Sequence, residues 1–102
     1  MNSLVEAKRP ELIDLCLRHR VRKLELFGSA VGDRFKPETS DFDFLVEFDP
    51  TPPAESARCF FGLLFALQDL FGRDVDLVET VAIRNPYFLQ SVAKDRVLLY
   101  AA

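Results

Sequence analysis

Residues 41–48 read DFDFLVEF, and an aromatic or aliphatic side chain recurs at every second position. Successive side chains of a strand point to opposite faces, so this alternation predicts a strand with one fully apolar face. That face would carry Phe42, Phe44, Val46 and Phe48. The opposite face would carry Asp41, Asp43, Leu45 and Glu47. The stretch therefore predicts a buried strand that presents two carboxylates, two residues apart, on its other side.

Helix and strand patterns surround this stretch in both directions. The predicted helices lie at residues 10–19, 54–71 and 87–94. Strands are predicted at 21–27 and 75–78, while 97–100 could form a last strand or an extended tail. Gly72 would end the second helix in the left-handed conformation, and Asn85-Pro86 is a helix-start pair for the third. This order predicts an α+β fold, a small mixed β-sheet with helices packed on one side.

Length and composition bound what the chain can be. Its 102 residues suffice for a single domain, 1–102, with a modest core and no second substrate domain. A hydrophobic fraction of 49% beside 28% charged residues is typical of a globular chain. The formal net charge of −3 argues against direct binding of nucleic acid, because such surfaces need a field of Lys and Arg.

Location is inferred from what the sequence lacks. No apolar run reaches the roughly 18 residues of a membrane span, and the N-terminus MNSLVEAKRPELIDL has charges where a signal peptide needs an apolar core. We therefore expect a cytoplasmic protein. Cys16 and Cys59 form no CxxC pair, and with His19 as the single histidine no zinc cluster is predicted. Both cysteines are interpreted as small core residues, and His19 as a helix-end residue.

The predicted strand 21–27 runs directly into Gly28-Ser29, and a loop then leads to Asp41. A glycine lets the backbone approach a phosphate closely, and a serine at the start of a short helix adds a hydroxyl to free N–H groups that favour anions. Arg34 and Lys36 in the loop could add positive charge. Together these residues predict a site for a triphosphate.

The acidic residues predict the metal. Asp41 and Asp43 would lie about 7 Å apart along one strand face, where two cations about 3.5–4 Å apart could be shared between them. Mg²⁺ prefers a few carboxylates together with phosphate oxygens, which suits an open pair. Asp76 interrupts the apolar strand 75–78, where an unpaired buried carboxylate would be costly. If that strand lies beside 41–48, Asp76 can complete a triad and act as a metal ligand or a general base.

Each feature alone has an ordinary structural explanation. A Gly-Ser pair after a strand is commonly a turn, and an isolated Asp-x-Asp is commonly solvated or caps a helix. Turns do not account for three acidic residues placed on strand faces. The combination therefore predicts a metal-dependent phosphate site.

At these residues the chain resembles the DNA polymerase beta superfamily, and within it the minimal nucleotidyltransferase (MNT) domains. The matching residues are Gly28-Ser29, Asp41, Asp43 and Asp76, and the resemblance extends from Thr39 to Phe48 and from Arg84 to Tyr100. It implies the polymerase beta-like nucleotidyltransferase fold, ATP as substrate and Mg²⁺ as cofactor. Many relatives carry an arginine where this chain has Val31, so phosphate contact from that position is lost or moved to Arg34.

The resemblance also implies a function. Stand-alone MNT domains are usually antitoxins, encoded beside a HEPN-domain ribonuclease toxin that they neutralise by adding AMP to a tyrosine hydroxyl. A first alternative is a non-catalytic antitoxin that blocks its partner by binding; the intact aspartates weigh against it and Val31 slightly for it. A second is transfer to a small molecule, as in the aminoglycoside nucleotidyltransferases, which add a further domain to hold the drug.

The helix predicted at 54–71 has more apolar width than one contact needs. One stripe would face the sheet, and it consists of Phe60, Leu63, Leu64, Leu67 and Phe71. Phe61 and Phe65 recur four apart on a flank beside it. Either the whole helix is sunk in the core, or this flank is exposed and docks a second subunit, the toxin or another copy of the chain.

Overall fold

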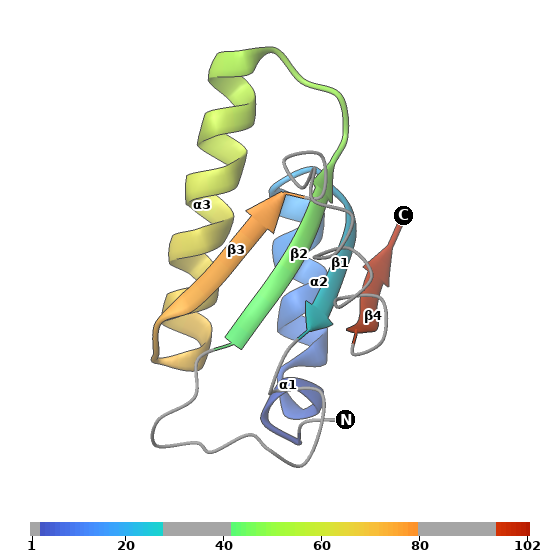
Figure 1. The fold of residues 1–102 in the computed structure, drawn as a ribbon, viewed down its shortest axis with the longest axis vertical. Coiled ribbons are helices and arrows are strands. Elements are labelled where there is room, and N and C mark those ends of the chain that lie inside the picture. Colours follow the sequence, from blue (N-terminus) through green and yellow to red (C-terminus); the bar gives the residue numbers. More distant parts are fainter. Residues whose placement is uncertain (1–2, 28–41, 80–95) are drawn as a thin grey trace, which may run out of the picture.

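The structure, a computed structural model, describes residues 3–27, 42–79 and 96–102. The helices within these ranges are α1 (Ser3–Ala7), α2 (Arg9–Arg18) and α3 (Pro53–Phe71). The strands are β1 (Val21–Phe27), β2 (Phe42–Phe48), β3 (Val75–Glu79) and β4 (Arg96–Ala101). The strands form one sheet in the order β3-β2-β1-β4, and α2 and α3 pack on the same side of it (Figure 1). The predicted α+β fold is confirmed, and the helix predicted at 87–94 lies outside the described residues.

The sheet is mixed because its connections differ. β1 pairs antiparallel with β2 and with β4, so the segment around 97–100 is a strand and not a tail. β2 and β3 are parallel, and α3 supplies the crossover that parallel neighbours require. The carboxyl end of β1 consequently lies beside the amino ends of β2 and β3, at the lower end of the sheet in Figure 1. We call this the Phe27 end of the sheet.

The core lies between the sheet and the helices. Phe42, Phe44 and Val46 are fully buried, as the alternation of β2 predicted, whereas Phe48 at the end of the strand is half-buried. Leu45 is buried on the other face. The ring centroids of Phe42 and Phe44 lie 4.6 and 6.0 Å from that of Phe71, the last residue of α3. The helices contribute the buried side chains of Leu12, Cys16, Leu63 and Leu67. Side chains of β2 on the other face are therefore directed away from the helices.

The helix ends follow from proline and glycine. α2 starts at Arg9 and is separate from α1, because Pro10 lacks the backbone N–H that a continuous helix would need. The segment Ser3–Ala7 is thus a short helix of its own. Gly72 ends α3 with φ 63°, which confirms the left-handed cap.

The two cysteines differ in their surroundings. Cys16 is buried in the core, and burial raises the pKa of its thiol to about 12. Cys59 is only half-buried on α3, so its interpretation as a core residue was wrong. Its position on the helix, and not its residue type, decides its exposure. Among the described helices, none is long and apolar enough to span a membrane.

His19 caps α2, as predicted, and it also fixes how closely α2 and α3 approach. A Cβ atom added to Gly62 on α3 would lie only 2.9 Å from Cε1 of the His19 ring. Partial burial lowers the pKa of His19 below its ordinary value of 6.5, and the positive charge of Arg18 lowers it further. The ring therefore packs in its neutral form against the backbone of α3.

This packing should make stability depend on pH. Because the pKa of His19 is lower in the folded state, its contribution is complete above pH 6.5 and is lost as the pH falls toward the folded value. We expect the melting temperature to fall between about pH 7.5 and about pH 5.5 by more in the wild type than in His19→Gln. Thermal unfolding followed by circular dichroism measures this. Equal pH dependence in both proteins would remove His19 as the cause.

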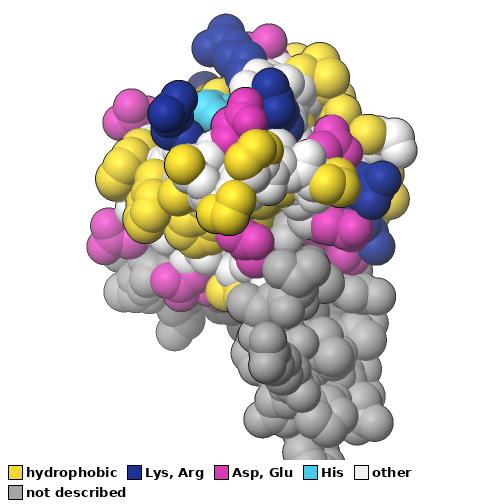
Figure 2. Space-filling view, turned by 90° about the horizontal axis from the view of Figure 1, so that it is seen from above, with side chains coloured by type: hydrophobic (Ala, Val, Ile, Leu, Met, Phe, Trp, Pro, Cys, Tyr) yellow, Lys and Arg dark blue, Asp and Glu magenta, His cyan; other side chains and the backbone are white. Residues whose placement is uncertain are grey.

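Some large apolar side chains remain at the surface. Among the described residues they are Ile13, Leu17, Phe61, Phe65 and Leu98. Phe61 and Phe65 lie on the outer side of α3. Of the two alternatives that the sequence left for this flank, burial in the core or exposure, the structure shows exposure. Figure 2, seen from above, shows hydrophobic side chains gathered on the left, the side on which α3 lies in Figure 1.

Candidate active site

Two predicted site residues meet at the Phe27 end of the sheet. Asp43 is paired with Phe27 of β1 on one side and with Asp76 of β3 on the other. Paired residues on neighbouring strands lie about 4.8 Å apart and direct their side chains to the same face. The condition under which Asp76 can join the site, that its strand lies beside the strand of Asp43, is therefore met, and the two carboxylates are neighbours across β2 and β3.

Both carboxylates lie on the sheet face that is directed away from the helices. Phe42 and Phe44, which flank Asp43, are buried in the helix-facing core, and so are Val75 and Leu77, which flank Asp76. Alternation then places Asp43 and Asp76 on the opposite face. The pair is thus held by well-packed strands on either side of each aspartate, which gives the carboxylates a firm backbone support.

The exposure of Asp76 corrects the sequence argument. Asp76 was expected to need a partner because it interrupts an apolar strand, yet its side chain is exposed, and Asp43 is half-buried. The reason is that β3 buries only its helix-facing residues, Val75 and Leu77, so an aspartate between them can reach solvent. Asp76 is therefore not a buried carboxylate that needs a partner. It belongs to the acidic site because it is paired with Asp43 across β2 and β3.

The other predicted site residues lie outside the described ranges. These are Gly28, Ser29, Arg34 and Asp41, together with Val31 and Lys36. In the sequence Gly28 follows Phe27 directly and Asp41 precedes Phe42, and Phe27 and Phe42 are both at the Phe27 end of the sheet. Within the ranges that are described, no group of three or more Asp, Glu, His or Cys side chains is placed to hold a metal ion. The described part of the site is a pair of carboxylates.

Arg73 is a charged residue near this end of the sheet that sequence analysis missed. It lies in the turn between α3 and β3, and its guanidinium carbon is 5.1 Å from the centroid of the Phe42 ring. A cation over an aromatic face is stabilised by the ring electrons. This contact holds the positive charge of Arg73 near the start of β2. In the sequence it follows a helix-capping glycine, where a solvated turn residue is the usual interpretation.

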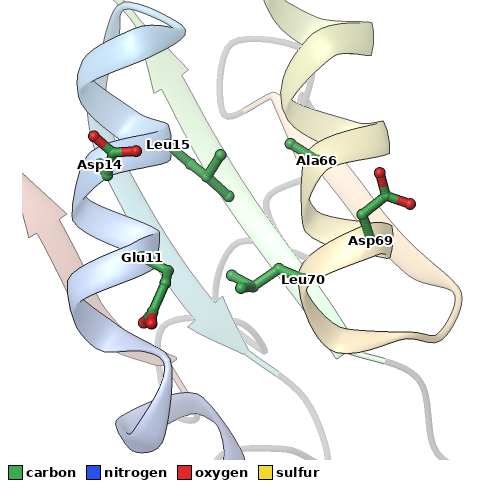
Figure 3. A pocket seen from close by; sticks show the side chains of 6 residues that line it. All are labelled: Glu11, Asp14, Leu15, Ala66, Asp69 and Leu70. Atoms are coloured by element: carbon green, nitrogen blue, oxygen red, sulfur yellow. The ribbon is translucent and has the colours of Figure 1, made fainter.

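A hollow between α2 and α3 is a poor phosphate site. It has a volume of about 360 Å³ and is lined by Glu11, Asp14, Leu15, Ala66, Asp69 and Leu70 (Figure 3). Asp14 pairs with Arg18 at 2.7 Å, but Glu11 and Asp69 make no ion pair with a described residue. Carboxylates at the rim would repel a triphosphate. The hollow is also on the helical side of the sheet, opposite the face of Asp43 and Asp76.

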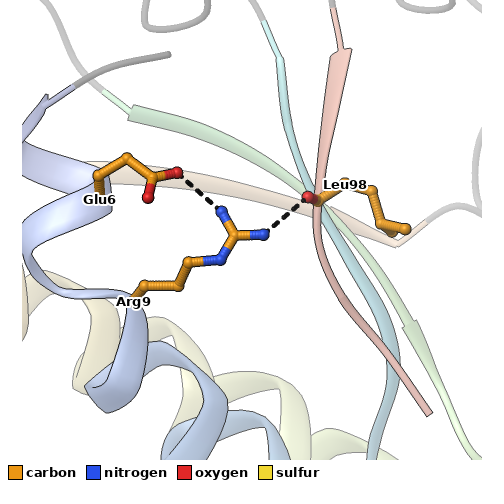
Figure 4. A network of polar contacts seen from close by, with 3 residues as sticks. All are labelled: Glu6, Arg9 and Leu98. Carbon is orange, nitrogen blue, oxygen red and sulfur yellow. Dashed lines mark hydrogen bonds and ion pairs between the residues drawn. The ribbon is translucent and has the colours of Figure 1, made fainter.

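A second polar cluster is structural. Nη1 of Arg9 lies 2.9 Å from a carboxylate oxygen of Glu6, and Nη2 donates a hydrogen bond of 3.5 Å to the carbonyl oxygen of Leu98 (Figure 4). These contacts join α1 and α2 to β4, at the edge of the sheet. They stabilise the position of the last strand and leave no group free for catalysis. The carboxylate pair is therefore the best candidate site among the described residues.

Comparison with known sequences identifies the family of the chain. Residues 10–99 match the family described as nucleotidyltransferase domain. A protein of Methanocaldococcus jannaschii, named as an inferred protein adenylyltransferase, is 41% identical over 78 residues, which are 76% of this chain and 76% of the relative. The family match includes both strands that carry the carboxylate pair.

Solved structures share the fold. A structure described as that of an inferred minimal nucleotidyltransferase is 29% identical and superposes with a TM-score of 0.71, covering 95% of each chain. The complex of a tri-AMPylated HEPN toxin with an MNT antitoxin from Shewanella oneidensis superposes with a TM-score of 0.65 at 21% identity. That match covers 95% of this chain and 72% of the other, and it indicates a common fold.

Proposed function

Because the chain belongs to the nucleotidyltransferase domain family, we propose that it transfers AMP from ATP to a tyrosine hydroxyl of a partner HEPN ribonuclease toxin and so acts as an antitoxin. The observation that carries the proposal is the register of Asp43 opposite Asp76 on the sheet face directed away from the described helices. Asp76 is exposed and Asp43 is half-buried. Two neighbouring carboxylates that reach solvent near the ends of their strands are suited to meet a substrate.

The residues fit a magnesium-dependent site. Mg²⁺ prefers carboxylates combined with substrate phosphate oxygens, and the carboxylates of Asp43 and Asp76 are neighbours on the sheet face directed away from the described helices. Asp41, Asp43 and Asp76 would hold the ions, two of them in our proposal. When bound, the ions supply neutralising charge for the phosphates. Gly28 and Ser29 would bind the triphosphate through backbone N–H groups and a hydroxyl, and Arg34 would add positive charge.

The proposed reaction is a displacement at the α-phosphorus of ATP. The acceptor oxygen of the tyrosine forms a bond to that phosphorus, and the bond to the β-phosphate oxygen breaks, so that pyrophosphate leaves. Asp76, which would share one carboxylate oxygen with an ion, accepts the proton of the tyrosine hydroxyl on its other oxygen and so acts as general base. Asp76 is suited to this role because its exposed side chain can reach an incoming acceptor while its neighbours Val75 and Leu77 anchor the strand.

The choice of a protein acceptor rests on the relatives. The relative with 41% identity is named for protein adenylylation, and a structural neighbour is an antitoxin bound to an AMP-modified toxin. The alternative function is a non-catalytic antitoxin that neutralises its partner by complex formation.

Intact mass of the partner distinguishes the two functions. The chain is co-expressed with the product of the neighbouring gene, and both proteins are weighed by mass spectrometry. Transfer predicts that the partner gains one or more adenylyl groups, located on tyrosine by peptide mapping. A stable complex in which neither protein gains mass would favour the non-catalytic antitoxin. Modification of neither protein together with no complex would contradict both functions.

Replacing Asp76 tests the general base. We expect Asp76→Asn to slow transfer on the order of 10²- to 10⁴-fold, the usual contribution of a positioned base. Asp74→Asn is the matched control, because Asp74 is also exposed but lies in the turn before β3. The initial rate of AMP transfer is measured for both variants at saturating ATP. Equal rates in the two variants would remove Asp76 from the mechanism.

A further inference from the structure

The outer side of α3 carries an aromatic pair that the fold does not use. Phe61 and Phe65 are 52% and 59% exposed, and their ring centroids lie 6.3 Å apart in a stacked arrangement. Phe60, which is half-buried, contacts Phe61 edge-on at 5.3 Å and so supports the pair from the core side. The two exposed rings are therefore ordered by their neighbours and present one continuous apolar surface.

Opposite charges stand at the two ends of this pair. Arg58 precedes Phe61 by three residues and Asp69 follows Phe65 by four, so all of these side chains share one side of the helix. Arg58 and Asp69 are both exposed, and neither makes an ion pair with a described residue. From the start to the end of α3, this surface therefore presents a positive charge, two aromatic rings and a negative charge.

This order is complementary to itself. The midpoint of Phe61 and Phe65 falls at residue 63, and that of Arg58 and Asp69 falls between residues 63 and 64. At a rise of 1.5 Å per residue the two midpoints are less than about 1 Å apart. A two-fold axis through this point would turn the helix end for end, so that each positive end meets a negative end while aromatic meets aromatic. Closed dimers use such self-matching surfaces.

We propose that a second copy of the chain docks here, with the two α3 helices antiparallel across a two-fold axis. The phenylalanines of the two subunits pack at the centre, and Arg58 pairs with Asp69 of the partner subunit at both ends. A hollow of about 370 Å³ lies beside the patch, lined by Phe60, Leu77, Val78 and Glu79. It is an apolar recess that can receive an aromatic ring from the partner. Docking of this kind does not depend on catalysis.

Sedimentation equilibrium of the full chain tests whether Phe61 and Phe65 hold the two subunits together. We expect a reversible dimer at a protein concentration of about 100 µM, which corresponds to a dissociation constant in the micromolar range. Phe61→Asp with Phe65→Asp should be monomeric at that concentration with an unchanged circular dichroism spectrum. The matched control is Ile13→Asp with Leu17→Asp, which places the same charges on two exposed apolar positions of α2, and it should remain dimeric. A monomeric wild type, or a monomeric control, would overturn the proposal.

Charge reversal tests the geometry without touching the apolar surface. Arg58→Asp and Asp69→Arg should each weaken self-association by about tenfold or more, because like charges then meet at both ends. In an equimolar mixture of the two variants, each end again pairs opposite charges, so a mixed dimer should form with wild-type affinity. A mixture as weak as its components would exclude the antiparallel arrangement. The experiment with the two charge variants remains informative even if the double variant Phe61→Asp with Phe65→Asp does not fold.

Discussion

Replacing Asp43 with asparagine is expected to lower nucleotidyl transfer by about 10³-fold or more, because a lost metal ligand removes several kcal/mol of charge stabilisation from the transition state. Asp43 occupies the centre of the site, paired with Phe27 on one side and with Asp76 on the other. The side chain lies outside the core, so the free energy of unfolding should stay within about 1 kcal/mol of the wild-type value. Asp41→Asn should behave alike.

Transfer rate and thermal stability are measured on the same purified protein. Asp14→Asn is the control, since Asp14 is an exposed aspartate of α2 whose ion pair with Arg18 lies on the helical side of the sheet. It should retain wild-type activity. Magnesium-dependent transfer that persists in Asp43→Asn would contradict the assignment of the site. Loss of activity in both variants would indicate a general effect of lost charge.

Truncating Phe44 is expected to destabilise the protein more than any of the surface substitutions. Phe44 is fully buried in β2, with its ring centroid 6.2 Å from that of Phe42 and 6.0 Å from that of Phe71. Phe44→Ala would leave a cavity between β2 and α3 and destabilise the fold by about 3–5 kcal/mol. Since small domains are stable by only about 5–15 kcal/mol, a large part of the total would be lost. Urea unfolding measures the change.

Phe65→Ala is the control for Phe44→Ala, because it removes the same ring from an exposed position of α3. We expect it to cost less than about 1 kcal/mol. The core variant and the site variant also separate two causes of inactivity. Asp43→Asn should be folded and inactive, whereas Phe44→Ala should lose activity only to the extent that it unfolds. A Phe44→Ala protein as stable as the wild type would contradict the packing described for α3 on β2.

Much of the fold could be predicted because it depends on local pattern. The alternation of residues 41–48 predicts the burial of Phe42, Phe44 and Val46, whereas Leu45 is buried on the other face and Phe48 is half-buried. Gly72 could be predicted as the end of α3 because only a residue without a Cβ takes a left-handed conformation at little cost. The position of β3 beside β2 was left open by the sequence, although a strand, a helix and a strand in this order commonly form a parallel unit.

Other features could not be predicted because they depend on contacts between distant residues. Asp76 was expected to be buried by its apolar neighbours, and its exposure is decided by which face of β3 meets α3. Cys59 has the residue type of a core side chain and is half-buried because of its angle on α3. Arg73 approaches Phe42 only when the turn after α3 returns to the sheet. None of these is a property of a short stretch of sequence.

Residue types and their spacing are properties of the sequence alone: Asp41 and Asp43 two residues apart, Asp76 further along the chain, and the phenylalanines that recur between residues 60 and 71. Residues two apart share a face of a strand, and residues three or four apart share a side of a helix. This holds because the backbone geometry is the same in every strand and in every helix. The register that brings Asp43 opposite Asp76, and the side of α3 that stays open, come from the folded structure. Register and exposure depend on how β1, β2, β3 and α3 pack together. They could therefore not be predicted from the sequence of any one of these elements.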